Sequence, residues 1–155
     1  MYIISHRLQL LLFMNINSIE DITAYIYSKG GRITLIRKMI LEILLEAKSP
    51  LSSQDILTII VASGYKPNKT TIYREVDFLL SIHLIRELEV GDSSKRYELC
   101  NRAPHLHSFC TACGEVACID TKVSLNSSVL EKLSKSGFSA SSTNTVVQGT
   151  CKGCR

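Results

Sequence analysis

The chain has 155 residues, of which 45% are hydrophobic and 21% charged, as in a folded protein of one ordinary domain or two small ones. This composition excludes disordered, collagen-like and low-complexity proteins. The net charge of +4 does not by itself indicate a nucleic-acid partner, and the absence of Trp argues against a base-stacking platform. The cysteines cluster late in the chain, at Cys100, Cys110, Cys113, Cys118, Cys151 and Cys154.

Residues 1–17 are interpreted as an N-terminal extension. Their apolar run is far shorter than the roughly 20 residues that span a bilayer, and His6, Arg7 and Gln9 interrupt any signal-peptide core. Met14 offers a second start, which would make the residues before it an artefact of start-site assignment. We therefore expect a cytoplasmic protein without a membrane partner. In that reducing compartment, paired cysteines are more often metal ligands than disulfides.

The first half of the chain predicts three short helices. Apolar residues recur at helical spacing over residues 33–47. Ser52 and Asp55 form a capping box that opens a second helix, and Asn68 can cap a third. The inner face of this third helix is predicted to consist of Ile72, Val76, Leu79 and Leu80.

A β-hairpin follows, with strands at residues 84–90 and 95–100 around a four-residue loop that contains Gly91. Three short helices and then a hairpin is the order of a winged helix-turn-helix. We assign residues 18–100 to this domain and residues 101–104 to a hinge.

The remainder, residues 105–155, is predicted to be a small α/β domain. It has a strand near 116–120, a helix over about 124–136 that stops at Gly137, and a strand after Phe138. The inner face of the helix is predicted to carry Leu125, Val129, Leu130 and Leu133. So small a domain needs a staple or a partner, because apolar burial alone would hold it weakly.

Two CxxC pairs supply the staple. Within each pair, two thiolates from one tight turn can share a tetrahedral ion, and Gly114 and Gly153 permit the turns. Such a structural zinc could contribute about 10–16 kcal/mol to folding. The alternative is a thioredoxin-like redox motif, which uses one pair rather than two distant ones. The predicted zinc ligands are Cys110, Cys113, Cys151 and Cys154.

A second group of metal-ligand residues surrounds the hinge. Glu98 and Cys100 are two residues apart, as are His105 and His107, so each pair shares a face in extended backbone; Cys118 lies beyond the first CxxC pair. Imidazole with thiolate suits Zn²⁺, whereas imidazole with carboxylate also admits Fe²⁺ or Mn²⁺. Isolated surface histidines and buried free cysteines are the alternative. We predict a regulatory metal site here and leave open whether Glu98 or Cys100 is the ligand.

No catalytic zinc motif accompanies these residues. A deaminase needs H-x-E with P-C-x-x-C, but Leu106 and His107 follow His105, and Phe109 precedes Cys110. The H-E-x-x-H motif of metalloproteases is absent from the sequence. We therefore expect neither enzymatic activity nor a small-molecule substrate.

Basic side chains concentrate in two stretches without acidic residues, 29–38 and 63–74, at the ends of the predicted helix-turn-helix. They are Lys29, Arg32, Arg37, Lys38, Lys66, Lys69 and Arg74. With Ile72 facing inward, the third helix would present hydroxyls, an aromatic ring and an arginine to base edges. The alternative is a solvated helix face. The candidate DNA-binding residues are Arg32, Lys69, Thr70, Thr71, Tyr73 and Arg74.

In combination, these motifs resemble the ferric uptake regulator family of metal-dependent repressors. The resemblance covers about residues 19–155 in the family's order. The matching motifs are Gly31-Arg32-Ile33-Thr34-x-x-Arg37, Thr71-Ile72-Tyr73-Arg74, Tyr97-Glu98-Leu99, His105-x-His107-x-x-Cys110-x-x-Cys113-Gly114 and Cys151-x-x-Cys154.

The resemblance implies an α+β fold, in which a winged-helix domain precedes an α/β dimerisation domain with a four-cysteine zinc site. It also implies a homodimer that binds palindromic operators when a regulatory metal is bound. Glu98, His105 and His107 fall on regulatory ligand positions, Tyr73 and Arg74 on recognition-helix contacts, and Arg32 on a residue that reaches the minor groove.

The chain departs from the family pattern in several places. The usual His-rich run before the first CxxC pair is reduced to His105 and His107, and Thr143 stands where another histidine is expected. Ser49-Pro50 stands where many relatives have a histidine, and Cys118 replaces a common carboxylate. The sulfur-rich ligand set makes zinc the first choice of effector, ahead of iron or manganese, and suggests a regulator of zinc uptake. An iron or manganese sensor, a peroxide sensor and a zinc-stabilised winged-helix protein-interaction module remain alternatives.

Overall fold

A computed structural model of the chain describes residues 18–91, 94–100, 105–119, 127–138 and 145–155. They fall into two compact units, one spanning Asn15–Asn101 and the other including Arg102–Arg155. The predicted extension at residues 1–17 and the predicted hinge at 101–104 lie outside the described residues, so the predicted domain limits stay a prediction. Among the described helices, none is both long enough and apolar enough to cross a membrane.

The N-terminal unit contains four helices: α2 (Ile19–Ser28), α3 (Leu35–Glu46), α4 (Ser53–Ala62) and α5 (Lys69–Ser81). A polar side chain caps the start of each by accepting a backbone N–H, and these caps are Ser18, Thr34, Ser52 and Asn68. The predicted capping box of α4 and the predicted cap of α5 are confirmed. Helix α2 was not predicted, although its Ser18 cap precedes a helically spaced apolar trio, Ile22, Tyr25 and Ile26.

The hairpin prediction is confirmed. Strands β2 (Ile85–Glu89) and β3 (Lys95–Leu99) pair antiparallel, with Arg86 opposite Glu98. A two-residue strand, β1 (Leu51–Ser52), pairs with the other edge of β3 and gives the strand order β1-β3-β2. So short a strand has no periodicity from which it could have been predicted.

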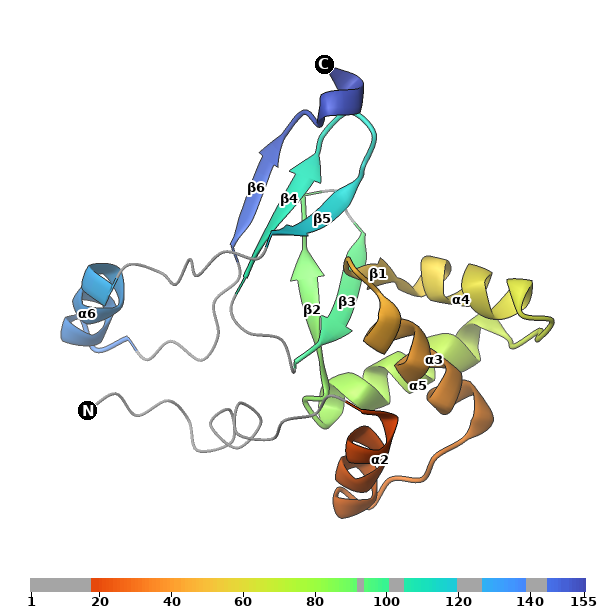
Figure 1. The fold of residues 1–155 in the computed structure, drawn as a ribbon. Coiled ribbons are helices and arrows are strands. Elements are labelled where there is room, and N and C mark those ends of the chain that lie inside the picture. Colours follow the sequence, from red (N-terminus) through yellow and green to blue (C-terminus); the bar gives the residue numbers. More distant parts are fainter. Residues whose placement is uncertain (1–17, 92–93, 101–104, 120–126, 139–144) are drawn as a thin grey trace. The chain divides into compact units, whose positions relative to one another are not determined.

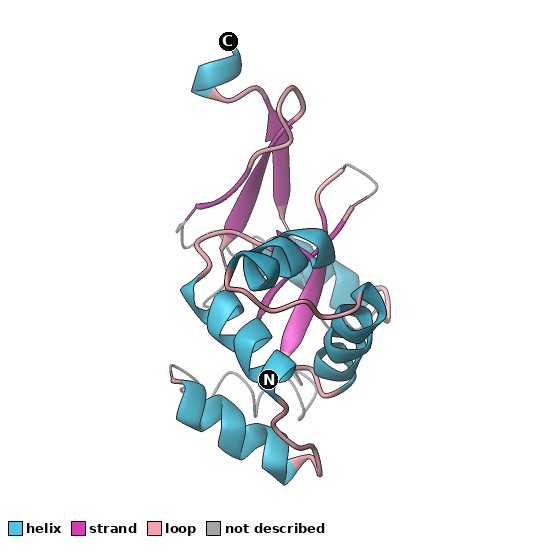
Figure 2. Ribbon diagram, turned by 90° about the vertical axis from the view of Figure 1, so that its right-hand side faces the viewer, coloured by secondary structure: helices cyan, strands magenta, loops and turns pink. Residues whose placement is uncertain are grey.

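The core of this unit lies between the helices and the sheet (Figure 2). Ile72, Val76 and Leu79 of α5 are buried as predicted, while Leu80 is half-buried. Since these residues orient the helix, Tyr73 and Arg74 lie on its exposed side. Among the described residues, the largest fully buried side chains of this core are Ile22, Ile26, Ile40, Leu41, Leu44, Ile56, Ile60, Ile72, Leu79, Leu84, Leu88 and Leu99.

The C-terminal unit contains a second sheet of three strands in the order β5-β4-β6 (Figure 1). They are β4 (Leu106–Cys110), β5 (Val116–Ile119) and β6 (Val146–Gly149). Strand β4 pairs antiparallel with β5 and parallel with β6. The predictions of a strand near 116–120 and of a strand after Phe138 are confirmed; for the segment that forms β4 the sequence indicated only extended backbone.

Helix α6 (Ser127–Lys135) confirms the predicted helix, whose first residues, 124–126, lie outside the described part of the chain. It ends as expected: Gly137 has a φ of +82°, and its N–H bonds to the Ser134 carbonyl. Its inner face is only partly as predicted, because Val129 is 42% exposed and Leu133 half-buried. Periodicity shows which residues share a helix face, but it does not show how completely the fold covers that face. The side chains of Leu125 and Leu130 lie outside the description.

Candidate metal centres and nucleic-acid interface

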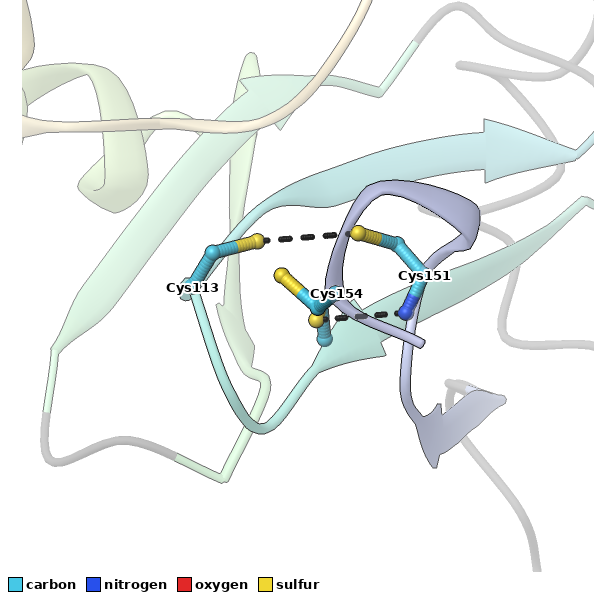
Figure 3. A group of neighbouring side chains, drawn as sticks. Cys113, Cys151 and Cys154 are labelled. Carbon is cyan, nitrogen blue, oxygen red and sulfur yellow. Dashed lines mark hydrogen bonds between the residues drawn. The ribbon is translucent and has the colours of Figure 1, made fainter.

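The two CxxC pairs form one cluster in the C-terminal unit. Their four sulfur atoms all lie within 4.8 Å of one another. Cys110 is the last residue of β4, and Cys113 lies in the turn toward β5. Cys151 is the N-cap residue of the short C-terminal 3-10 helix η1 (Lys152–Cys154), and Cys154 is its last residue (Figure 3). The cluster therefore joins two segments that are far apart in the sequence.

Backbone pairing brings these two turns together. The parallel ladder of β4 and β6 places Cys110 opposite Gly149. Just beyond it, the Thr111 N–H donates to the Gly149 carbonyl over 2.8 Å. Gly114, with a φ of +75°, lets the first turn close through its N–H to the Cys110 carbonyl. The ladder thus aligns the ends of the two strands from which the cysteines project.

The electrostatics of the cluster fit a divalent cation. The Cys151 N–H, which lies 3.3 Å from the Cys110 sulfur, and the Cys113 and Ala112 N–H groups lower the pKa of the Cys110 thiol to about 6. Hydrogen bonding to the neighbouring Cys151 and Cys113 thiols raises the pKa of Cys154 to about 12. The Cys110 thiolate therefore forms readily, whereas the Cys154 thiol needs a compensating positive charge nearby before it loses its proton.

The spacing of the sulfurs also suits zinc. The Cys113 and Cys151 sulfurs are 3.8 Å apart. Zn–S bonds of roughly 2.3 Å in a tetrahedral arrangement place pairs of sulfurs about 3.8 Å apart. This pair has the separation that a tetrahedral zinc requires, and the four sulfurs, all within 4.8 Å of one another, are compatible with a structural zinc site.

A second cluster lies on the same sheet. His107 of β4 and Cys118 of β5 are cross-strand neighbours, and the His107 Nδ1 and Cys118 Sγ atoms are 3.6 Å apart. The ring of His105 stands edge-on to that of His107, with 4.6 Å between centroids. His107 is 1% exposed. The sheet thus brings together three of the five predicted regulatory ligands.

The other two predicted ligands belong to the N-terminal unit. Glu98 is buried on β3, and its carboxylate pairs with Arg86 across the hairpin at 2.5 Å. Cys100 follows the last residue of β3, and burial raises the pKa of its thiol to about 11. Near neutral pH, Cys100 is therefore protonated in the absence of a metal.

The predicted DNA-binding residues are mostly exposed. Lys69, Thr70, Tyr73 and Arg74 lie on the exposed side of the first turns of α5, and Thr71 is half-buried. Arg32 is exposed in the loop between α2 and α3. These side chains are accessible to a partner, as a nucleic-acid interface requires.

The structure corrects the prediction for one residue of the basic stretch at 29–38, Arg37. The sequence groups it with the residues available for phosphate contacts, but it is only 9% exposed and pairs with Glu75. The sequence shows a charge at this position; it does not show that the helix turns this charge toward the neighbouring helix.

The family is identified by comparison with known proteins. Residues 28–147 match the model of the ferric uptake regulator family. The peroxide-responsive repressor PerR of Staphylococcus aureus is 27% identical over 142 residues, which are 90% of this chain and 93% of that protein.

Solved structures show the same fold. The ferric uptake regulator of Vibrio cholerae superposes with a TM-score of 0.71 at 21% identity, covering 83% of this chain and 98% of that one. The regulator of Helicobacter pylori superposes with a TM-score of 0.70 at 22% identity, covering 95% and 93%. With its winged-helix order and its two ligand clusters, this chain belongs to the ferric uptake regulator family.

Proposed function

We propose that this protein is a homodimeric repressor that binds palindromic DNA operators when a regulatory zinc ion is bound, and that it controls genes of zinc uptake or homeostasis in the cytoplasm. The observation that carries the proposal is the packing of His105, His107 and Cys118 into one donor group on a sheet. Two imidazoles and a thiol form a ligand set that suits zinc. The exposed face of α5 supports the DNA-binding part of the proposal.

The four-cysteine cluster would hold a structural zinc. Cys110, Cys113, Cys151 and Cys154 supply four sulfur donors and no open position, as structural rather than catalytic zinc sites do. When bound, the ion neutralises the thiolates and joins the β4 turn to the C-terminal turn. In this role the ion stabilises the fold and takes no part in a reaction, which agrees with our expectation that the protein is not an enzyme.

The regulatory site would take its remaining ligand from the β2–β3 hairpin, which is the wing of the winged-helix domain. His105, His107 and Cys118 hold the metal from the C-terminal unit, and Glu98 or Cys100 holds it from the end of β3. Linking the two units restricts the orientation of the recognition helices in the dimer, which must match the spacing of two half-sites. Loss of the metal frees this orientation and lowers the affinity for the operator.

The alternatives differ in their ligands. An iron or manganese sensor would use Glu98 and both histidines without a thiol. A peroxide sensor would oxidise a metal-bound histidine, and the 27% identity to PerR of S. aureus keeps this interpretation open. A zinc-stabilised protein-interaction module would not bind DNA. Cys118, at the position facing His107, favours zinc.

Fluorescence anisotropy of a labelled duplex from the region upstream of the gene tests the proposal. The chain, with its structural zinc retained, is titrated at fixed salt against buffered zinc, then against ferrous and manganous ions. We expect zinc alone to switch on binding, and we expect binding to weaken as salt rises. Cys118→Ser and His107→Ala should abolish the zinc response, whereas Ser108→Ala, a change on the same strand, should preserve it.

The other outcomes select the alternatives. Binding switched on by iron or manganese would remove both thiols from the ligand set and favour Glu98. Gain of one oxygen atom on His105 or His107 after peroxide treatment, seen by mass spectrometry, would indicate a peroxide sensor. Operator affinity that stays independent of metal in the wild type would leave the second cluster without a regulatory role.

A further inference from the structure

Arg37 makes several contacts at once from the first turn of α3. Its Nε donates to Glu75 Oε2 over 2.6 Å, and its guanidinium lies 3.7 Å from the centre of the Phe78 ring. Its Nη1 donates to the backbone carbonyl of Arg32. Glu75 and Phe78 both belong to α5, so this one side chain connects the loop before α3 with the recognition helix.

The same loop is held from its other side. The Gly31 N–H bonds to the Ile26 carbonyl at the end of α2. A Cβ at Gly31 would lie 2.6 Å from the Phe78 ring, so the loop backbone packs directly against α5. Thr34 caps α3 by accepting the Arg37 N–H. The backbone of Arg32 is thus fixed at both ends of the loop, while its side chain is exposed.

Stability alone is a weak reason for this arrangement. A buried ion pair often gains no more than it costs in desolvation, and apolar residues of similar size can replace it. What a buried guanidinium does supply is geometry, because its planar fork can bond to two acceptors while its face covers an aromatic ring. A lysine has a single nitrogen and cannot make this set of contacts.

We propose that Arg37 is a positioning residue for DNA binding, which sets the distance between the exposed Arg32 and the recognition residues Tyr73 and Arg74 by tying the Arg32 carbonyl to Glu75 and Phe78. The inference rests on the proposed DNA-binding function. It requires that Arg37 act through Arg32 and not through a DNA contact of its own, since its side chain is almost entirely buried.

A double-mutant cycle on the full metal-loaded chain tests this. Arg37→Lys keeps the charge but loses the fork. We expect it to weaken duplex binding about tenfold and to lower the slope of log affinity against log salt by about 1, the loss of one phosphate-type contact. In an Arg32→Ala background the same substitution should have no further effect. Leu44→Val, which removes buried volume at the far end of α3, controls for lost stability and should bind like the wild type.

A second variant, Glu75→Gln, tests the proposal independently in case Arg37→Lys does not fold. Glu75→Gln removes a negative charge, a change that would by itself strengthen DNA binding; weaker binding must therefore come from altered geometry. Hydrogen exchange supplies a measurement that needs no DNA. Both variants should speed exchange of the amides of residues 29–34 relative to those of α4, which serve as an internal reference.

The results separate the two proposals. A wild-type chain that binds no duplex in any metal state would overturn the proposed function, and the positioning role with it. If the wild type binds and Arg37→Lys weakens binding equally with and without Arg32, Arg37 acts elsewhere and the inference is wrong. Unchanged exchange in the loop, or tighter binding by Glu75→Gln, would also overturn it.

Discussion

Two arginines five residues apart in the N-terminal unit have opposite environments. Arg32 is exposed beside the recognition helix, whereas Arg37 is buried against it and holds the Arg32 carbonyl. In the sequence both belong to one basic stretch. The difference arises because α3 begins at Leu35 after the Thr34 cap, which turns Arg37 toward Glu75 and Phe78. Two charges of the same sign, close in the sequence, can therefore differ in environment: one is exposed and the other is buried in contacts with the fold.

Gly31 lies at the tightest point of this loop, and we expect Gly31→Ala to destabilise the N-terminal unit by about 1–3 kcal/mol, as overpacking does. The added Cβ would meet Phe78 at 2.6 Å and Ile26 at 2.8 Å. Neither neighbour can withdraw freely, since Arg37 covers the Phe78 ring and Ile26 is fully buried. The test is urea unfolding followed by the helical circular-dichroism signal. Gly149→Ala, with no heavy atom within 4 Å of its Cβ, is the control. Equal midpoints for the two variants would contradict the prediction.

At the scale of elements, β4 contributes residues to both candidate metal clusters. His107 faces Cys118 across the antiparallel ladder with β5, and Cys110 stands opposite Gly149 in the parallel ladder with β6. His107, a proposed regulatory ligand, and Cys110, a proposed zinc ligand, are thus on one strand, three residues apart. Loss of the zinc from the four-cysteine cluster should therefore disturb the sheet that positions the regulatory ligands. Loss of a regulatory ligand should leave the four-cysteine cluster and its zinc in place.

This asymmetry predicts the metal content of two cysteine variants. We expect the zinc-loaded wild type to hold two ions per chain, one for each cluster, and Cys118→Ser to hold about one. Cys113→Ser should hold neither ion. A structural zinc contributes about 10–16 kcal/mol to folding, and without it we expect the small unit not to keep β4 and β5 paired in register. Plasma mass spectrometry of the purified proteins gives the ratio of zinc to protein. Ala112→Ser, in the same turn, should keep both ions; a Cys113→Ser protein with full zinc content would refute the role of the staple.

At the scale of the whole molecule, the C-terminal unit leaves large apolar side chains exposed. They include Val129 of α6 at 42%, Phe138 at 59% and Val147 of β6 at 54%. A small unit with this much exposed apolar surface gains free energy by pairing with a second copy. The surface agrees with the proposed homodimer, in which two recognition helices would meet one palindrome.

We expect Val129→Lys to weaken dimerisation about a hundredfold. A two-fold interface contains the substitution twice. At each copy, losing the burial of the exposed part of Val129 and removing a lysine charge from water together cost roughly 1.5 kcal/mol or more. Sedimentation velocity over a dilution series gives the dissociation constant. Ser134→Lys adds the same charge at an exposed position of α6 and should leave the dimer unchanged. A Val129→Lys protein that stays as dimeric as the wild type would place the interface elsewhere.

Local signals determined much of this protein without a structure. The Ser52–Asp55 box, the Asn68 cap and the Gly137 stop each act within one helical turn, and the structure confirms all three. The CxxC pairs likewise bring two thiols together within a single turn. Such features can be recognised because the interacting groups are close in sequence.

Only the tertiary structure decided the contacts between distant segments. It joined the two CxxC pairs through the β4–β6 ladder, set His107 against Cys118, and turned Arg37 from a predicted phosphate contact into a buried tie between α3 and α5. It also left Val129 exposed where periodicity placed it inward. Strand register and helix packing depend on the whole set of side chains that compete for the core, so no window of the sequence contains them.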